Sequence, residues 1–331
     1  MKRLFHTATA ASTAVCLGLG LSLALPGKAV AQAWPSKPIR IVLGFAPGAI
    51  TDTIARAIGN QVSKSIGQPV LIDNRAGAGG TISADAVARA APDGYTILLG
   101  EPGGMSINPL LMPGISYNVA RDFAPIAQVV TLPVALVANP GAGVQKLADL
   151  QTMVTANKAL AYGSPGPGSH QHLSMELLKI ATGLPFIHVP YKGGAPAITD
   201  LLGGQIPLVA ITVPTVAAQV KQGRIVALAI LGKTRSAAMP DVPTVVEAGF
   251  PQYSTPPLWQ GFFAPANTPK DIVNRLNAEI RKALDVPEVR NSLQGSGAEV
   301  VVNSPEEFAK MLREETPLLT RAIQAGNVKA Q

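Results

Sequence analysis

The chain has 331 residues, with 27 Lys and Arg against 20 Asp and Glu, and Cys16 is its only cysteine. The formal net charge of +7 comes without a basic run or an aromatic ladder, so the composition gives no indication of nucleic-acid binding. The length is sufficient for two domains of ordinary size.

The N-terminus has the pattern of a secretory signal. Lys2 and Arg3 precede an uncharged, mostly apolar stretch over 8–25, and A-x-A cleavage sites end at Ala31 and Ala33. We expect residues 1–33 to be a cleaved signal peptide, with the cut after Ala33 favoured over Ala31, and the remainder to be exported to the periplasm. A retained membrane anchor is the alternative, since the apolar stretch approaches the length that spans a bilayer.

Cleavage would change the chemistry of the chain. It removes Cys16, so the mature protein could form no disulfide and would depend on its apolar core for stability. It also removes Lys2, Arg3 and Lys28 without any acidic residue, which lowers the formal net charge from +7 to +4. This small positive charge slightly favours anionic partners at long range.

Short apolar, β-branched runs then alternate with segments of helical periodicity. A buried strand is predicted at 39–43 and a helix from Thr51 that ends at Gly67. Further strands are predicted at 70–72, 95–99, 135–137, 160–162, 187–189, 208–211 and 225–231, and helices at 145–158, 169–182 and 193–203. Two long helices, 269–284 and 305–324, are predicted around a short strand at 299–302. This alternation predicts an α/β fold with two lobes, each a mostly parallel sheet flanked by helices.

Glycine and hydroxyl residues cluster in three loops that directly follow predicted strands, at 45–52, 74–81 and 162–169. Ligands of open α/β sheets bind beyond the carboxyl ends of the strands. Backbone N–H groups at helix starts bind anions without a charged side chain, and glycine lets the backbone approach a ligand closely. One such loop alone is explained as a tight turn with a helix cap, but three together predict a site for a small anion.

The sequence contains no convincing catalytic site, so we expect no enzyme, no cofactor and no metal. The run 163–168 is not a Walker loop, because no G-K-[ST] follows it, and no G-x-G-x-x-G motif opens the first predicted strand–helix unit. The sequence therefore does not indicate nucleotide binding. The residues that a serine hydrolase could use are Ser164, Ser169, His170, His172 and His188. However, Pro165 removes the backbone N–H that an oxyanion hole would need after Ser164. His170 and His172 are two residues apart on a predicted helix, so they face different directions and do not form a zinc pair.

Several motifs, taken together, extend along almost the whole chain. In chain order they lie at 34–42, 45–48, 51–52, 74–80, 91–96, 108–109, 122–123, 162–164, 166, 168–169, 172–173, 188–193, 200–205, 240–244, 259, 261 and 264–265. This series resembles the Bug-type receptors, which are the TctC-like periplasmic substrate-binding proteins of tripartite tricarboxylate transporters.

The resemblance implies a fold and a role. The fold would be a type II-like, Venus-flytrap binding protein, with lobe one formed by 34–136 plus 256–331 and lobe two by 137–255. The protein would capture a small mono- or dicarboxylate, aromatic ones included, and deliver it as a monomer to membrane permease subunits. A receptor that reports ligand occupancy to a membrane sensor would have the same site, so the sequence leaves both roles open.

The resemblance also implies which residues bind the ligand. In the family, the first two strand–helix loops of lobe one hold a carboxylate through backbone N–H groups and hydroxyls. The corresponding residues are Gly48, Thr51, Asp52, Ala78, Gly79 and Gly80 in lobe one, and Ser164, Gly168 and Ser169 in the loop of lobe two. Asp200 would lie near the distal end of the ligand.

Three residues depart from the family pattern. The family usually has Pro-Gly-Gly before its Thr/Ser-Asp, whereas this chain has Pro47-Gly48-Ala49-Ile50 before Thr51-Asp52, and we expect Ile50 to narrow the pocket or make it more apolar. Glu101 and Met105 lie in a loop that should face the cleft. An acid there would repel an anionic ligand unless it points away or pairs with a base, whereas Met105 would suit an apolar or aromatic ring.

Overall fold

The computed structural model describes residues 34–112, 114–157, 159–326 and 328. The predicted signal peptide, its cleavage sites and Cys16 lie outside these residues. The compact unit that begins at Lys37 contains every helix and strand considered below. In the described ranges, none of the helices combines the length and apolar character needed to cross a membrane.

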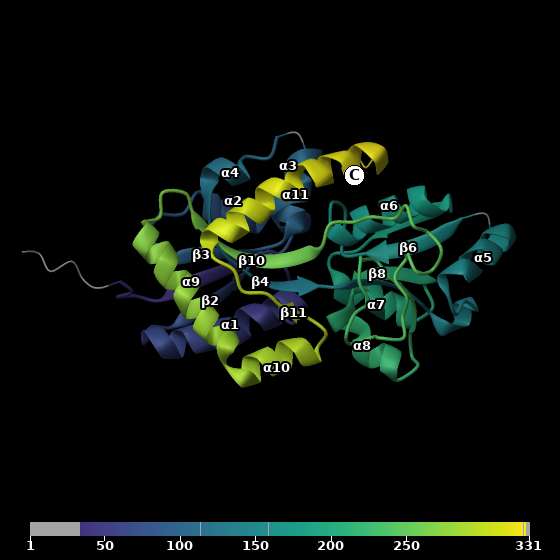
Figure 1. Cartoon of the computed structure of the whole chain (residues 1–331), viewed down its shortest axis with the longest axis horizontal. Coiled ribbons are helices and arrows are strands. Elements are labelled where there is room, and N and C mark those ends of the chain that lie inside the picture. Colours follow the sequence, from purple (N-terminus) through teal and green to yellow (C-terminus); the bar gives the residue numbers. More distant parts are fainter. Residues whose placement is uncertain (1–33, 113, 158, 327, 329–331) are drawn as a thin grey trace, which may run out of the picture. The chain divides into compact units, whose positions relative to one another are not determined.

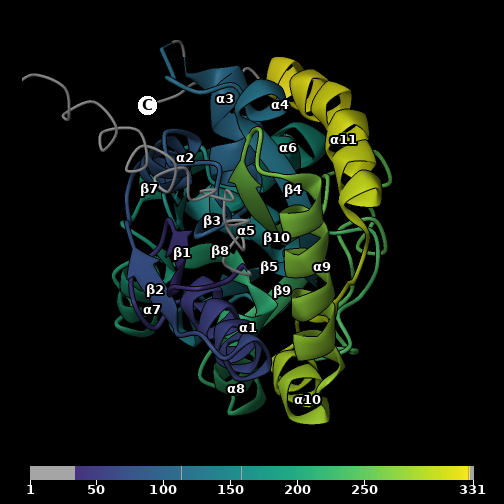
Figure 2. The ribbon, with the colours of Figure 1, turned by 90° about the vertical axis from the view of Figure 1, so that its left-hand side faces the viewer.

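The first sheet has six strands in the order β11-β4-β10-β3-β1-β2 (Figure 1). They are β1 (Ile39–Leu43), β2 (Val70–Asn74), β3 (Thr96–Gly100), β4 (Phe123–Leu132), β10 (Leu258–Pro265) and β11 (Glu299–Val300). Its accompanying helices are α1 (Ile50–Ile66), α2 (Thr81–Ala88), α3 (Asn108–Leu111), α4 (Val119–Asp122), α9 (Lys270–Asp285), α10 (Pro287–Gly295) and α11 (Pro305–Gly326). Helices α1 and α9 lie side by side (Figure 2).

The second sheet has five strands in the order β7-β6-β8-β5-β9. They are β5 (Val134–Ala138), β6 (Leu160–Ser164), β7 (Phe186–Pro190), β8 (Leu208–Thr212) and β9 (Val226–Ile230). The helices of this part are α5 (Leu150–Asn157), α6 (His170–Thr182), α7 (Gly194–Leu202) and α8 (Val213–Lys221).

The predicted α/β class with two lobes is confirmed, but both sheets are mixed rather than mostly parallel. β1 pairs in parallel with β2 and β3, and β6 pairs in parallel with β7 and β8. In the first sheet, β10 pairs antiparallel with β3 and β4, and β11 pairs antiparallel with β4. In the second sheet, β5 pairs antiparallel with β8 and β9. Because β5 pairs only within the second sheet, the predicted lobe boundary after residue 136 would cut through a strand. We propose Pro133, between β4 and β5, as the boundary instead.

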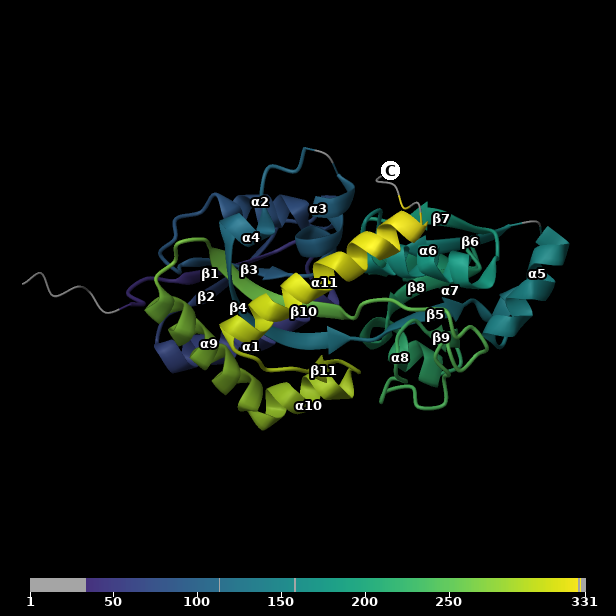
Figure 3. The same cartoon turned by 45° about the horizontal axis from the view of Figure 1, so that its top comes forward.

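The core of the first sheet is organised around β10, all of whose residues are buried. Trp259 meets the Phe308 ring of α11 nearly edge to face, with ring centroids 5.4 Å apart. Gly261 makes room for that ring, because a Cβ there would lie 2.3 Å from it. Further along α11, Leu319 packs with Leu173 of α6, so the C-terminal helix contacts helices of both sheets (Figure 3).

Candidate functional site

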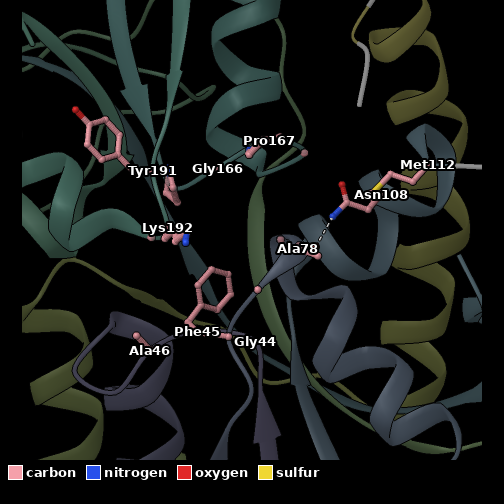
Figure 4. A pocket seen from close by; sticks show the side chains of 16 residues that line it. Gly44, Phe45, Ala46, Ala78, Asn108, Met112, Gly166, Pro167, Tyr191 and Lys192 are labelled. Atoms are coloured by element: carbon pink, nitrogen blue, oxygen red, sulfur yellow. Dashed lines mark hydrogen bonds between the residues drawn. The ribbon is translucent and has the colours of Figure 1, made fainter. Parts of the chain in front are cut away.

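Two cavities border the loop after β1 and are also lined by residues from the lobe of the second sheet. Cavity 1, of about 430 Å³, is bounded by the loops after β1, β2, β6 and β7 (Figure 4). Cavity 2, of about 520 Å³, is bounded by the loop after β1, the starts of α7 and α8, and β10. Both cavities share the lining residues Phe45, Ala46, Pro165, Lys192 and Gly193. They therefore lie where the sequence predicted a site, beyond the carboxyl ends of β1, β2 and β6.

The loop after β1, residues 44–49 and here called loop A, leads directly into α1. The first N–H bonded within that helix is that of Thr53, which donates to the Ala49 carbonyl at 3.0 Å. The N–H groups of Ile50, Thr51 and Asp52 precede it, and Ala49 supplies no side-chain cap. Ile50 and Thr51 line cavity 2. The positive end of the α1 dipole thus faces a cavity, which favours an anion there.

Asp52 holds the loops together rather than facing a ligand. Its Oδ2 accepts hydrogen bonds from the Gly48 N–H at 3.0 Å and from Arg56 Nε at 2.9 Å, and its Oδ1 accepts from Asn74 Nδ2 at 3.0 Å. Burial alone would raise the pKa of Asp52, but the hydrogen bonds from Arg56, Gly48 and Asn74 outweigh it and lower the pKa. Since Asn74 ends β2, this carboxylate ties loop A to the next loop, and the Gly48 N–H is used within the protein.

The loop after β2, residues 75–80 and here called loop B, has a run of left-handed backbone conformations. Ala78 has φ +46°, and Gly79 and Gly80 have φ +59° and +91°. A non-glycine residue in this region is strained, and such strain is found preferentially at binding sites. Ala78 and Gly79 line cavity 1. Gly80 lies behind them, where a Cβ on Gly44 would come within 2.6 Å of its Cα, so the two loops touch through their backbones.

The loop after β6, residues 165–169 and here called loop C, presents its backbone to loop B. Gly166 and Gly168 line cavity 1, and a Cβ on Gly168 would lie 1.8 Å from Asn108 Oδ1. Asn108, at the start of α3, donates through Nδ2 to the Ala78 carbonyl at 3.2 Å. The Gly168 N–H donates to His172 Nδ1 at 3.3 Å. Glycine is therefore required where the loops of the two lobes meet.

The predicted hydroxyl residues of loop C are turned inward. Ser169 caps α6 by accepting from the His172 N–H at 3.2 Å, and it donates to the Gly166 carbonyl at 2.7 Å. Ser164 Oγ lies 2.7 Å from His188 Nε2 but is fully buried and also bonds to the backbone of Gly166. Neither serine lines cavity 1 or cavity 2. Both shape the loop from behind, and Ser164 is not presented as a nucleophile.

The three histidines of the described residues, His170, His172 and His188, pack against other parts of the protein. His172 and His188 stack with ring centroids 4.1 Å apart, and His170 Nε2 lies 2.6 Å from the Pro256 carbonyl. Burial lowers the pKa of both His170 and His172 to about 4, so both rings are neutral at neutral pH. Within the described residues, no group of three or more His, Cys, Asp or Glu side chains is placed to hold a metal ion.

Asp200 lies on α7 behind the cavities rather than in their lining. Its Oδ2 accepts a hydrogen bond from the Tyr191 hydroxyl at 2.8 Å. Tyr191 lines cavity 1, but its hydroxyl points away from Phe45 and Lys192 (Figure 4). Asp200 therefore fixes the segment after β7 that borders the cavity.

Sequence reasoning missed several lining residues. Lys192 borders both cavities, and among the described residues no carboxylate lies within ion-pair distance of its ammonium group. Phe45 projects toward the space below Lys192 (Figure 4), and Asn108 and Gln260 come from α3 and β10. The family-like segments 45–48, 108–109 and 188–193 contained three of these four residues, but nothing in their spacing identified the side chains that reach the cavities.

Two of the departures from the family pattern have different outcomes. Glu101 lines cavity 2 and is only 9% exposed, and burial raises its pKa to about 8 despite a hydrogen bond from Gln260. It is therefore mostly uncharged at neutral pH and does not repel an anion as an ionised acid would. The expectation for Met105 is wrong, because this side chain packs in the core with Trp259 and Phe263 and lines neither large cavity.

Comparison with known proteins gives a consistent result. The family model described as the tripartite tricarboxylate transporter family receptor, TctC, matches residues 54–328. The chain is 36% identical to BugT of Bordetella pertussis over 305 residues. This match covers 90% of this chain and 92% of BugT.

Solved structures of similar proteins have the same fold. MatC from Rhodopseudomonas palustris with bound malate is 34% identical, with a TM-score of 0.82 over 87% of this chain and 99% of that one. Another R. palustris protein, solved with adipate, is 33% identical, with a TM-score of 0.85 over 89% of this chain and 99% of that one.

Proposed function

Because the chain belongs to the TctC family of tripartite tricarboxylate transporter receptors, we propose that it captures a small mono- or dicarboxylate between its lobes and delivers it to the permease subunits of such a transporter. Members of this family are periplasmic solute-binding proteins, not enzymes. The proposal concerns the ligand class, the partner and the cleaved export signal over 1–33.

The observation that carries the proposal is the convergence of loops A, B and C on two adjoining cavities. The N–H groups at the start of α1 lie beside cavity 2, and Ala78, with its strained backbone, borders cavity 1 together with Gly79. Such N–H groups bind carboxylates through charge-assisted hydrogen bonds. The glycines of loop C let the second lobe close over the ligand.

Lys192 supports an anionic ligand independently. Its ammonium group borders both cavities, and Glu101, which carries the one carboxyl group among the described residues that line them, is mostly uncharged at neutral pH. A dicarboxylate could thus place one end at the start of α1 and the other near Lys192. The malate and adipate bound to two relatives have this chemistry.

Isothermal titration against a ligand panel tests the proposal. The panel should contain acetate, benzoate, succinate, malate, aspartate and adipate, with glucose and a neutral dipeptide as uncharged comparisons. We expect at least one acid to bind and neither neutral compound to do so. Lys192→Gln should weaken dicarboxylates by about tenfold, whereas Lys221→Gln, on α8 and outside both cavities, should leave affinity unchanged. Binding of the neutral compounds alone would refute the proposal.

The partner and the export signal are tested separately. Affinity capture with the ligand-loaded protein from solubilised membranes should retrieve permease subunits, and retrieval of a sensor protein instead would assign the alternative role. N-terminal sequencing of the exported protein should start at Trp34 for cleavage after Ala33, or at Gln32 for cleavage after Ala31. An intact N-terminus in the periplasmic protein would contradict cleavage.

A further inference from the structure

Two polar side chains that line cavity 2, Glu101 and Gln260, lie outside loops A, B and C, and they are here called the floor of this cavity. Glu101 follows β3, and Gln260 lies in β10. These strands pair antiparallel with Gly261 opposite Gly100. The same register, continued by one residue beyond the end of β3, places Gln260 opposite Glu101. Both are buried and both line the cavity.

The hydrogen bonds of this floor are incomplete. Gln260 Nε2 donates to Thr51 Oγ1 at 2.6 Å, but Gln260 Oε1 is buried with no hydrogen-bond partner among the described residues. A buried acceptor without a partner costs about 1–3 kcal/mol. In its uncharged form, the carboxyl group of Glu101 carries one O–H donor and keeps its carbonyl oxygen as a further acceptor in this cavity. A hydrogen-bond donor that enters cavity 2 would therefore remove an existing cost.

The position of the floor relative to loop A limits where that donor can sit on a ligand. Thr51 is in the first turn of α1, where a carboxylate would bind, and its hydroxyl is bonded directly to Gln260. A carboxylate at the start of α1 therefore places its neighbouring carbon, rather than a distant one, close to Gln260. The lining of cavity 2 also includes Ile50, Leu132 and Leu258, whose apolar side chains have no hydrogen-bond donor for Gln260 Oε1.

We propose that Glu101 and Gln260 form a subsite for a hydrogen-bond donor, a hydroxyl or an ammonium group, on the carbon next to the carboxylate of the ligand. The subsite rests on the proposed function, because it assumes that loop A holds a carboxylate. The ligand would thus be a hydroxy- or amino-carboxylate rather than a plain acid.

The charge of Glu101 distinguishes the two donors. Glu101 and Lys192 are the only ionisable residues among those that line cavity 2 in the described chain. Because burial raises the pKa of Glu101 to about 8, a hydroxyl can bind with Glu101 still protonated. An ammonium group would instead favour the ionised carboxylate, so its binding would release a proton to the buffer.

Titration at pH 7 with succinate, L-malate and L-aspartate tests the subsite, because the three share a carbon chain and differ only at the second carbon. We expect malate or aspartate to bind at least about tenfold more tightly than succinate. A preference for malate assigns the hydroxyl. A preference for aspartate, with a binding enthalpy that depends on the ionisation enthalpy of the buffer, assigns the ammonium group.

Two variants connect that preference to the floor residues. Gln260→Met should reduce the preference over succinate by about tenfold, while Glu101→Gln should weaken aspartate by about tenfold and malate by much less. Gln128→Met and Glu315→Gln are the matched controls, since Gln128 and Glu315 are buried, hydrogen-bonded and outside both cavities. They should leave the preference unchanged.

The possible failures are distinguishable. If succinate binds as tightly as malate and aspartate, or if Gln260→Met leaves the preference intact, the subsite is overturned and carboxylate binding stands. The subsite is also overturned if other acids of the panel bind and both malate and aspartate do not. If no acid binds at all, the proposed function itself is overturned.

Discussion

The contact between Gly168 and Asn108 provides the sharpest test of lobe closure. Gly168 has φ +68°, and an added Cβ would lie 1.8 Å from Asn108 Oδ1, where ordinary contact begins at 3.4 Å. Asn108 is almost fully buried and bonded to the Ala78 carbonyl, so it cannot retreat without leaving that bond. Gly168→Ala should therefore oppose the approach of loop C to loop B.

Gly168→Ala has two energetic costs, the backbone strain of the alanine and the displacement of Asn108, and a matched control variant separates them. An alanine with this positive φ is strained by about 1 kcal/mol. Gly183 has φ +69° with nothing within 4 Å of an added Cβ, so Gly183→Ala carries the strain alone. Displacing Asn108 and breaking its hydrogen bond adds about 1–3 kcal/mol, which corresponds to about five- to 150-fold in affinity.

Titration with the tightest-binding acid of the panel measures this difference. We expect the lobes of the ligand-free protein to open and relieve the clash, so both variants should lower its free energy of unfolding by similar amounts, but only Gly168→Ala should weaken ligand binding. Adding Asn108→Ala to Gly168→Ala should restore part of the affinity, because it removes the clashing amide. If Gly168→Ala binds the ligand as tightly as Gly183→Ala does, the two loops do not meet in the ligand-bound state and the reasoning is wrong.

Three further predictions concern the frame of the site and the core. Asp52→Asn should weaken ligand binding by about tenfold without changing the residues that line the cavities, since it loosens the link between loops A and B, and titration would detect this. Burial raises the pKa of Glu315 to about 7 despite a hydrogen bond from Trp259, so the native state holds this proton more tightly than the unfolded chain, whose value is near 4.5. The stability that this difference provides is present below about pH 4.5 and is lost as the pH rises through 7. Glu315→Gln should therefore flatten the wild-type decline, of the order of 2–3 kcal/mol, in urea unfolding series from pH 4.5 to 8, and an unchanged slope would contradict this. Gly261→Ala should cost about 3 kcal/mol, measured by the same unfolding, because its Cβ would lie 2.3 Å from the Phe308 ring; a loss below 1 kcal/mol would show that the ring moves freely.

Much of the fold could be predicted because local patterns specified it. The strand at 39–43 and the helix that ends at Gly67 appear as expected, since Gly67 adopts the left-handed cap at φ +70°. β4 and β10 were not predicted. Both are largely buried and interrupted by Pro or Gly, so they lack the alternation that marks a strand with one exposed face. Their antiparallel pairing depends on contacts between distant parts of the chain.

The candidate site could be located from sequence but not resolved into contacts. The glycine-rich loops predicted a site beyond the strand ends, where the two cavities lie, because that rule depends only on topology. The roles of Ser164, Ser169 and Asp200 could not be inferred, since a hydroxyl or carboxylate in a loop can face the ligand or its own backbone. Lys192 and Gln260 reach the cavities only through the tertiary arrangement.

A crystal structure of the protein with its tightest-binding acid tests the central claim most directly. We predict a ligand carboxylate in the joined cavities, accepting hydrogen bonds from N–H groups at the start of α1 and from Ala78 or Gly79 of loop B. A ligand whose carboxylate lies outside these cavities, or inside them without contact to either loop, would contradict the account.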